Sequence, residues 1–166
     1  MTITSPLTPV SSDGFRRALG SFATGVTVIT TLAGDRPAGF TCQAFSTVSL
    51  SPPLVLFCVS DTSETWPAIR ATGRFCVNVL SAGQVGLGGA FARRREERFE
   101  EVRWRASPGG MPMLEEAVAW IDCTLREHRP AGDHHIVLGA VHHVGTDPGR
   151  DPLLYFRGTL GYAGLP

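Results

Sequence analysis

Residues 26–60 read VTVITTLAGDRPAGFTCQAFSTVSLSPPLVLFCVS, and the pattern of this stretch decides the fold. Its first segment is β-branched and alternating, and its last segment is continuously apolar. Clusters of Gly, Asp and Pro separate the segments, which is typical of strands joined by tight turns. We predict three strands here, at residues 26–32, 38–50 and 54–60, the second of them interrupted in its middle. Strands joined in this way pair antiparallel.

Upstream of this stretch, the spacing of apolar residues predicts a helix. We expect Ser12 or Asp13 to cap it, Gly25 to end it, and one apolar stripe to face the core. The stripe consists of Phe15, Ala18, Leu19, Phe22 and Ala23.

Downstream, the pattern predicts strands at 74–80, around 120–125, at 134–145 and at 153–157. Helices are expected at 66–72, loosely at 83–92, and as a short piece within 114–128. Many short strands with few helices between them indicate an antiparallel barrel rather than a doubly wound sheet.

The chain has 166 residues and 17.8 kDa, which fits one domain. We expect a flexible tail over 1–11 and a single domain over 12–166. With 43% hydrophobic and 18% charged residues, the chain as a whole is not disordered. Its formal net charge is 0, so the chain has no overall positive field of the kind that nucleic-acid binders carry. No nucleic-acid partner is therefore expected.

The N-terminal sequence and the cysteines indicate the cellular compartment of the protein. No basic-then-apolar signal pattern begins the chain, and no apolar run approaches the roughly 20 residues that span a bilayer. Cys42, Cys58, Cys76 and Cys123 are widely separated and sit among apolar residues, so we interpret them as buried, reduced thiols. We therefore expect a cytoplasmic protein with no membrane partner.

All 15 Lys+Arg residues are arginines. A chain without lysine cannot use a Schiff-base lysine, a Walker-type phosphate lysine or a Ser-x-x-Lys pair. Nor does it contain GxSxG, HExxH or a strand followed by GxGxxG. With no nucleophile–base pair visible, the chemistry of an enzyme with this sequence would belong to a cofactor.

Residues 41–51 are rich in small hydroxyl and amide side chains. They fit either the solvent-facing side of a half-buried strand or a binding surface that offers hydrogen-bond donors and acceptors to a polar heterocycle with a phosphate tail. Ser63 and Thr65, just before the 66–72 helix, fit either simple N-caps or an anion site. Because Asp61 and Glu64 would oppose an anion there, an arginine should offset them, either Arg98 or one of residues 93–95.

Four of the five histidines form two pairs, at 134–135 and 142–143. Adjacent residues of a strand point to opposite faces, so we expect neither pair to ligate one metal, and no metal site is predicted. The Gly132-Asp133-His134 turn before a strand could instead hold an imidazole at the rim of a pocket.

Several short motifs follow one another in a fixed order along the chain. They are Phe15-Arg16-Arg17-Ala18, Thr24-Gly25-Val26-Thr27-Val28-Ile29-Thr30, Gly39-Phe40-Thr41, Ser46-Thr47-Val48-Ser49-Leu50-Ser51-Pro52-Pro53-Leu54-Val55, Ser63-x-Thr65, Phe75-Cys76-Val77-Asn78-Val79-Leu80, Phe91-Ala92 with Arg98-Phe99, Gly110-Met111-Pro112-x-Leu114, Gly132-Asp133-His134 and Leu153-Leu154-Tyr155-Phe156-Arg157-Gly158. In these motifs the chain, from Phe15 to Gly161, resembles the flavin reductase-like family, the small reductase components of two-component flavin-dependent monooxygenases.

The resemblance implies a mainly β fold, a split antiparallel β-barrel of the Greek-key, FMN-binding type with a few short peripheral helices. It also implies a homodimer with flavin, FMN or FAD, bound near the subunit interface. By analogy, the isoalloxazine and ribityl chain would be lined by Thr41, Cys42, Gln43, Ala44, Ser46 and Thr47. Ser63 and Thr65 would hold the phosphate, Phe91 and Arg98 would help to close the site, and His134 would lie near the reacting face. Relatives often carry Ser or Asn where this chain has Gln43 and Ala44, so one flavin hydrogen bond is missing or reshaped.

The activity implied is that of an NAD(P)H:flavin oxidoreductase, with NADH or NADPH passing a hydride from nicotinamide C4 to flavin N5. Such a step needs stacking and orientation more than acid–base chemistry, so His134 would orient or polarise. Reduced flavin would then diffuse to an oxygenase partner. Three alternatives stay open at this stage: a flavin-binding protein without nicotinamide-dependent activity, a pyridoxamine-phosphate-oxidase-like barrel, and a metal-binding barrel that uses the histidine pairs.

Overall fold

The computed structural model describes residues 9–92, 99–100 and 102–161, and its largest element is one antiparallel sheet. The strands lie in the order β3-β2-β6-β9-β10-β5-β4. They are β2 Thr27–Ala33, β3 Arg36–Cys42, β4 Phe45–Leu50, β5 Pro53–Ser60, β6 Arg74–Val79, β9 Ala119–Ala131 and β10 His134–Thr146. The predicted strands at 26–32, 54–60, 74–80 and 134–145 are confirmed to within one residue.

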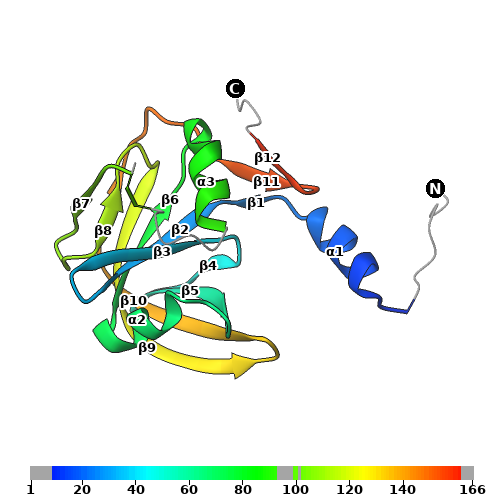
Figure 1. Ribbon diagram of the computed structural model, residues 1–166, viewed down its shortest axis with the longest axis horizontal. Helices are drawn as coiled ribbons and strands as arrows, with labels where there is room; N and C mark the ends of the chain where they lie inside the picture. The colour runs from blue at the N-terminus through cyan, green and yellow to red at the C-terminus, as the bar shows by residue number, and fades with distance from the viewer. Residues whose placement is uncertain (1–8, 93–98, 101, 162–166) are drawn as a thin grey trace.

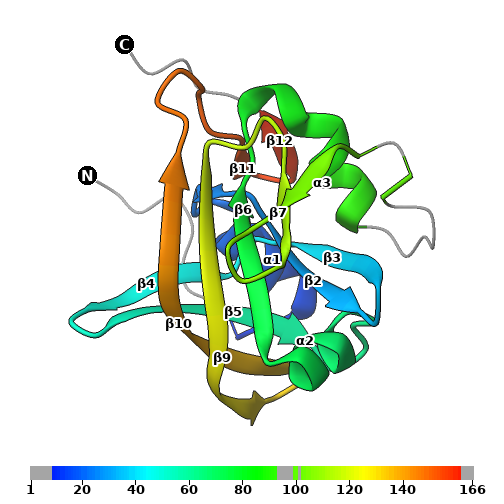
Figure 2. The same ribbon diagram turned by 90° about the vertical axis from the view of Figure 1, so that its left-hand side faces the viewer.

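The sheet curls because its two edge strands, β3 and β4, are consecutive in the chain and joined only by Gln43 and Ala44. Across the curl, the Cys58 N–H donates to the Ala44 carbonyl at 2.9 Å, and the Phe40 and Phe57 rings lie 6.0 Å apart. Figure 2 shows β6, β9 and β10 crossing the direction of β4 and β5 at a steep angle. This arrangement confirms the expected split barrel.

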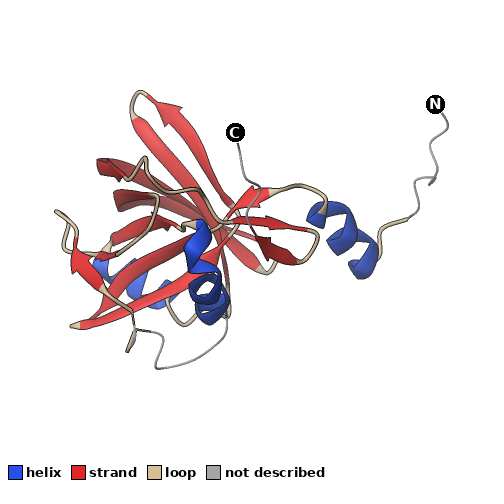
Figure 3. Ribbon diagram, turned by 90° about the horizontal axis from the view of Figure 1, so that it is seen from above, coloured by secondary structure: helices blue, strands red, loops and turns tan. Residues whose placement is uncertain are grey.

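Smaller elements surround the barrel. One minor sheet consists of β1 Thr24–Gly25, β11 Leu154–Phe156 and β12 Thr159–Gly161. The other is a pair of strands, β7 Trp104–Ala106 and β8 Pro112–Leu114. The helices are α1 Ser12–Gly20, α2 Trp66–Thr72, η1 Ala82–Gln84 and α3 Val85–Ala92, and they lie outside the strands (Figure 3). The helical piece expected within 114–128 is wrong, because β8 ends at Leu114 and a short turn leads directly into β9.

A buried amide ties the β7–β8 hairpin to the barrel. Asn78 on β6 is fully buried, and its Nδ2 donates to the Val28 carbonyl at 3.1 Å and to Thr30 Oγ1 at 3.0 Å. Its Oδ1 accepts the Leu114 N–H at 2.7 Å. Since an unpaired buried amide is costly, this set of partners stabilises one placement of β8 against the sheet.

Helix α1 differs from the prediction in its ends and its environment. Ser11, rather than Ser12 or Asp13, caps it by accepting the Gly14 N–H at 3.2 Å. The helix ends at Gly20 rather than Gly25, because Thr24 and Gly25 pair with β11. Its apolar stripe does not face the core, and α1 stands away from the barrel (Figure 1).

Parts of two predictions lie outside the described residues: most of the tail over 1–11, and the arginines at 93–95 and 98. No helix of the described chain is long and apolar enough to cross a bilayer.

Candidate functional site

The break between β3 and β4 leaves two backbone N–H groups without an acceptor in the described chain. The Gln43 carbonyl accepts the Phe45 N–H and the Ala44 carbonyl accepts the Cys58 N–H, both at 2.9 Å. Within the described chain, the N–H groups of Gln43 and Ala44 have no acceptor of their own. Because backbone N–H groups are obligatory donors, these two are available to a partner outside the described chain.

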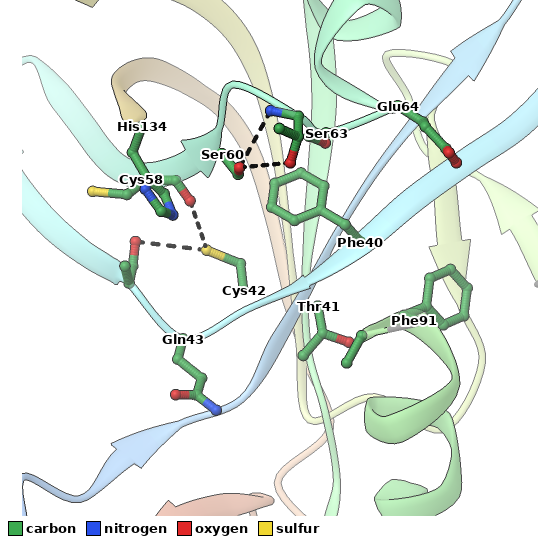
Figure 4. A pocket seen from close by; sticks show the side chains of 13 residues that line it. Phe40, Thr41, Cys42, Gln43, Cys58, Ser60, Ser63, Glu64, Phe91 and His134 are labelled. Atoms are coloured by element: carbon green, nitrogen blue, oxygen red, sulfur yellow. Dashed lines mark hydrogen bonds between the residues drawn. The ribbon is translucent and has the colours of Figure 1, made fainter. Parts of the chain in front are cut away.

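A cavity of about 420 Å³ opens at this break (Figure 4). Four segments contribute to its wall: the end of β3 with the break, the end of β5 with the following loop, the end of α3, and the start of β10. The lining residues are Phe40, Thr41, Cys42, Gln43, Ala44, Cys58, Ser60, Thr62, Ser63, Glu64, Phe91, Ala92 and His134.

The loop after β5 folds back on itself and leaves one hydroxyl free. Ser60 Oγ lies 3.0 Å from Thr62 Oγ1 and accepts the Thr62 N–H at 3.2 Å, while the Ser63 N–H donates to the Ser60 carbonyl at 3.0 Å. The Ser63 hydroxyl has no partner in the described chain, and it lines the cavity. It is therefore available to a ligand as donor or acceptor.

His134 reaches the cavity because the register pairs it with Ser60 across β10 and β5. Its Nδ1 lies 2.7 Å from Asp133 Oδ1, and the hydrogen bond and charge of His134 lower the pKa of Asp133. An ionised Asp133 accepts a hydrogen bond from the Nδ1–H group, so Nε2 is the ring nitrogen left for other partners. The imidazole side chain is 45% exposed, which makes it accessible to a ligand entering from solvent.

Helix α3 is fixed against β3 beside the cavity. Thr41 Oγ1 donates to the Gly88 carbonyl at 2.7 Å, so this hydroxyl is already engaged. A Cβ on Gly39 would lie 3.1 Å from the Phe91 ring, which explains why glycine stands opposite that buried side chain. Phe91 in turn meets the Phe99 ring edge-on at 5.0 Å.

The two thiols of the cavity are neutral. Burial raises the pKa of Cys42 to about 12 and also raises the pKa of Cys58. Cys42 Sγ contacts the Ala44 and Cys58 carbonyls at 3.6 and 3.5 Å. Since the thiolate is the reactive form, these cysteines act as apolar wall rather than as nucleophiles.

The structure brings seven of the predicted site residues together in the lining: Thr41, Cys42, Gln43, Ala44, Ser63, Phe91 and His134. Three others lie elsewhere. Ser46 and Thr47 are exposed on β4, and Thr65, only 3% exposed, occupies the N-cap position of α2 without a side-chain cap bond. Arg98 lies outside the described residues.

Sequence reasoning missed several lining residues, namely Phe40, Cys58, Ser60, Thr62, Glu64 and Ala92. A signal for two of them existed: Cys58 and Ser60 are two apart on a strand and therefore share a face. The pairing of β5 with β10, which places that face beside His134, was not visible in the sequence.

The histidine pairs behave differently from one another. His135 faces away from His134, with its ring 5.4 Å from Trp66 and 5.3 Å from His128 and its Nε2 3.1 Å from Asp61 Oδ1. This agrees with the expected alternation along the strand.

For the second pair, the expectation of opposite faces is wrong. His142 bonds Thr124 at 2.8 Å and His143 lies 3.3 Å from Asp122, and these two partners share one face of β9. A register shift between Val141 and His143 produces this arrangement. Within the described residues, no three His, Cys, Asp or Glu side chains gather as metal ligands.

Comparisons with known proteins place these features in a family. A family model described as a flavin reductase like domain matches residues 19–164. The reductase subunit HsaB of a flavin-dependent monooxygenase from Mycobacterium tuberculosis is 46% identical over 153 residues, which cover 91% of this chain and 81% of that protein. A flavin reductase from Pseudomonas putida is 42% identical over 94% of this chain and 91% of its own length.

Solved structures agree with the sequence comparison. The NADH:FAD oxidoreductase SgcE6 of Streptomyces globisporus superimposes with a TM-score of 0.89, at 35% identity, over 97% of this chain and all of that one.

Proposed function

Because this chain belongs to the flavin reductase-like family, we propose that the cavity at the β3–β4 break holds flavin while a nicotinamide nucleotide reduces it. The chain is an NAD(P)H:flavin oxidoreductase, with FMN or FAD and NADH or NADPH as its substrates. One observation supports this cavity most strongly. Residues that carry unpaired backbone donors, a free hydroxyl and an accessible imidazole line it from three separate segments.

The residues of the cavity fit a flavin. The unpaired N–H groups of Gln43 and Ala44 match the hydrogen-bond acceptors on the polar edge of the ring system. Phe40 and the neutral thiol of Cys42 give an apolar surface for its flat face. Bound flavin supplies the hydride acceptor, so the protein contributes binding and orientation.

His134 is proposed to orient the reacting partners. Asp133 engages Nδ1, which leaves Nε2 to contact flavin or nicotinamide without a second protein partner competing for it. Hydride transfer needs no base to remove a proton from carbon. An imidazole that orients the reactants is therefore sufficient for this step. The absence of a nucleophile–base pair from the sequence is consistent with this role.

We propose that Ser63 binds the flavin phosphate through its free hydroxyl. Thr65, Ser46, Thr47 and Arg98 stay predictions as flavin contacts. Because Thr65 is buried in this conformation, it would support the loop before α2 rather than touch a ligand.

The reduced flavin is proposed to leave and to serve an oxygenase partner. The half-exposed His134 side chain and the exposed loop at Thr62 and Glu64 support an open site from which flavin exchanges. An open pocket suits a flavin that is a shuttled substrate more than one that is permanently enclosed.

We also propose a homodimer, supported by the exposed apolar face of α1. Phe15 and Leu19 are 54% and 56% exposed on α1, which has no buried residue in the described structure, and Phe22, just after the helix, is 74% exposed. Amphipathic helices are stabilised by burying such a stripe, and a second copy would provide the surface.

A cytoplasmic location is proposed as well. All four cysteines are free, which is usual for proteins of a reducing compartment.

Steady-state oxidation of NADH and NADPH, each with FMN, FAD or no flavin, tests the function. The proposal predicts flavin-dependent turnover with at least one nicotinamide. Binding of flavin without turnover with either nicotinamide would instead identify a flavin-binding protein without reductase activity.

A further inference from the structure

The described lining of the cavity contains a single carboxylate, Glu64. It follows Ser63 directly and is exposed on the loop between β5 and α2. Within the described chain it forms neither an ion pair nor a hydrogen bond. In Figure 4 its side chain lies beyond the Phe40 ring, on the side of the cavity where Phe91 lies. An unpaired negative charge therefore lines the same cavity as the hydroxyl proposed to bind phosphate.

The same loop carries a second carboxylate, Asp61, which has a partner and does not line the cavity. Asp61 Oδ1 lies 3.1 Å from His135 Nε2. His134, the titratable base of the described lining, is already engaged by Asp133. Among the described lining residues, Glu64 is therefore the one carboxylate that a ligand phosphate would meet.

Glu64 performs none of the usual structural tasks of a glutamate before a helix. Helix α2 begins at Trp66, and its N-cap residue is Thr65. The Glu64 carboxylate accepts no N–H from the first turn of α2, and none of the salt bridges of the described chain includes it. Neither capping nor ion pairing accounts for a carboxylate at this place.

We propose that Glu64 is a specificity-determining residue that weakens the binding of phosphate-bearing flavins and thereby keeps the flavin exchangeable. The inference rests on the proposed function, because it assumes that flavin occupies this cavity. A carboxylate and a phosphate repel at short range, and solvent at an exposed loop reduces the repulsion without removing it. The repulsion acts on the phosphate tail alone, so the ring system binds through the backbone donors as before.

Equilibrium titration of Glu64→Gln with FMN and riboflavin tests this inference, because the two ligands share the ring and ribityl chain but only FMN carries the phosphate. We expect Glu64→Gln to bind FMN about 3- to 10-fold more tightly than the parent, from the removal of one nearby charge. Riboflavin affinity should stay unchanged. The gain for FMN should largely vanish at about 1 M salt, where the screening length falls to about 3 Å.

Asp35→Asn is the matched control. It removes an exposed carboxylate in the β2–β3 turn, at the opposite end of β3 from the cavity. The control should bind both flavins as the parent does, which separates a local effect from a change in net charge. Thermal melting of both variants verifies that the fold is intact.

Several results would overturn the inference. They are an unchanged FMN affinity in Glu64→Gln, equal gains for FMN and riboflavin, or a change confined to the KM for NADPH. In all three cases the parent still binds flavin, so the proposed function survives. If the parent protein bound neither FMN nor riboflavin, the proposed function would fail, and this inference with it.

Discussion

At the scale of single residues, the proposed site separates binding from reaction. Ser63 offers a free hydroxyl at one segment of the wall, and His134 offers a ring nitrogen at another. Hydrogen bonds to a phosphate contribute to affinity in the ground state, whereas orientation of the reacting atoms affects the rate. Variants at the two positions should therefore have different kinetic consequences.

Ser63→Ala should raise the Kd for FMN about 3- to 10-fold, because it deletes one hydrogen bond to a charged group at an exposed site. The limiting rate of flavin reduction at saturating FMN should change little. Fluorescence titration and steady-state kinetics measure the two effects. Ser51→Ala, in the exposed turn between β4 and β5 outside the lining, is the control. An equal loss of affinity in both variants would contradict a phosphate site at Ser63.

At the scale of elements, the apolar side of α1 has no buried residue within the part of the chain that the structure describes. Phe15 and Leu19 lie four residues apart and share this side, while Arg17 lies on the other. The backbone holds the end of the helix in place, since the Gly20 carbonyl accepts the Arg157 N–H at 2.7 Å. The helix is thus fixed to the β11–β12 hairpin but leaves its stripe free for a second copy.

The variant Phe15→Ser with Leu19→Ser should shift the protein from dimer to monomer, because it removes apolar area that only the partner would bury. Sedimentation velocity over a range of concentrations measures the shift. Arg17→Ser should leave the association unchanged. A monomeric parent protein, or a double variant as dimeric as the parent, would show that α1 does not mediate dimerisation.

Several strands and the break between β3 and β4 could be predicted from the sequence. Alternation along residues 26–32 and the apolar run at 54–60 predicted β2 and β5, because side-chain period and turn residues are local signals. The break at Gln43 and Ala44 was predicted as an interruption of the second strand, and it became the centre of the site.

Other features depend on contacts between distant segments and could not be predicted. The bulge that puts His142 and His143 on one face is set by pairing with β9. The burial of Thr65 and the exposure of Phe15 depend on how the loop before α2 and helix α1 pack against distant parts of the chain. The resemblance to known reductases, rather than periodicity, supplied the site residues that the cavity now unites.

At the scale of the whole molecule, the barrel holds together through close approaches in its interior. A Cβ on Gly139 of β10 would overlap the Phe75 ring of β6, and that ring packs edge-on against Phe57 at 5.1 Å. These three residues link three strands of the curled sheet. Any added volume at Gly139 must displace a fully buried aromatic ring.

Gly139→Ala should therefore lower the free energy of unfolding by about 1–3 kcal/mol through overpacking. Gly25→Ala, where an added Cβ meets no atom within 4 Å, should have a much smaller effect. Urea denaturation of the two variants and the parent measures the difference. Equal stabilities of Gly139→Ala and Gly25→Ala would mean that the Phe75 contact does not constrain the core.

The most direct test of the account is the rate at which NADH reduces flavin in the absence of oxygen, followed after rapid mixing by the loss of oxidised flavin absorbance. The parent and His142→Ala, a control on the distant part of β10, should reduce flavin at the same rate. His134→Ala should still bind flavin but reduce it about 10- to 100-fold more slowly, because orientation is lost. Reduction by His134→Ala at the rate of the parent would contradict the assignment of this cavity as the place where flavin is reduced.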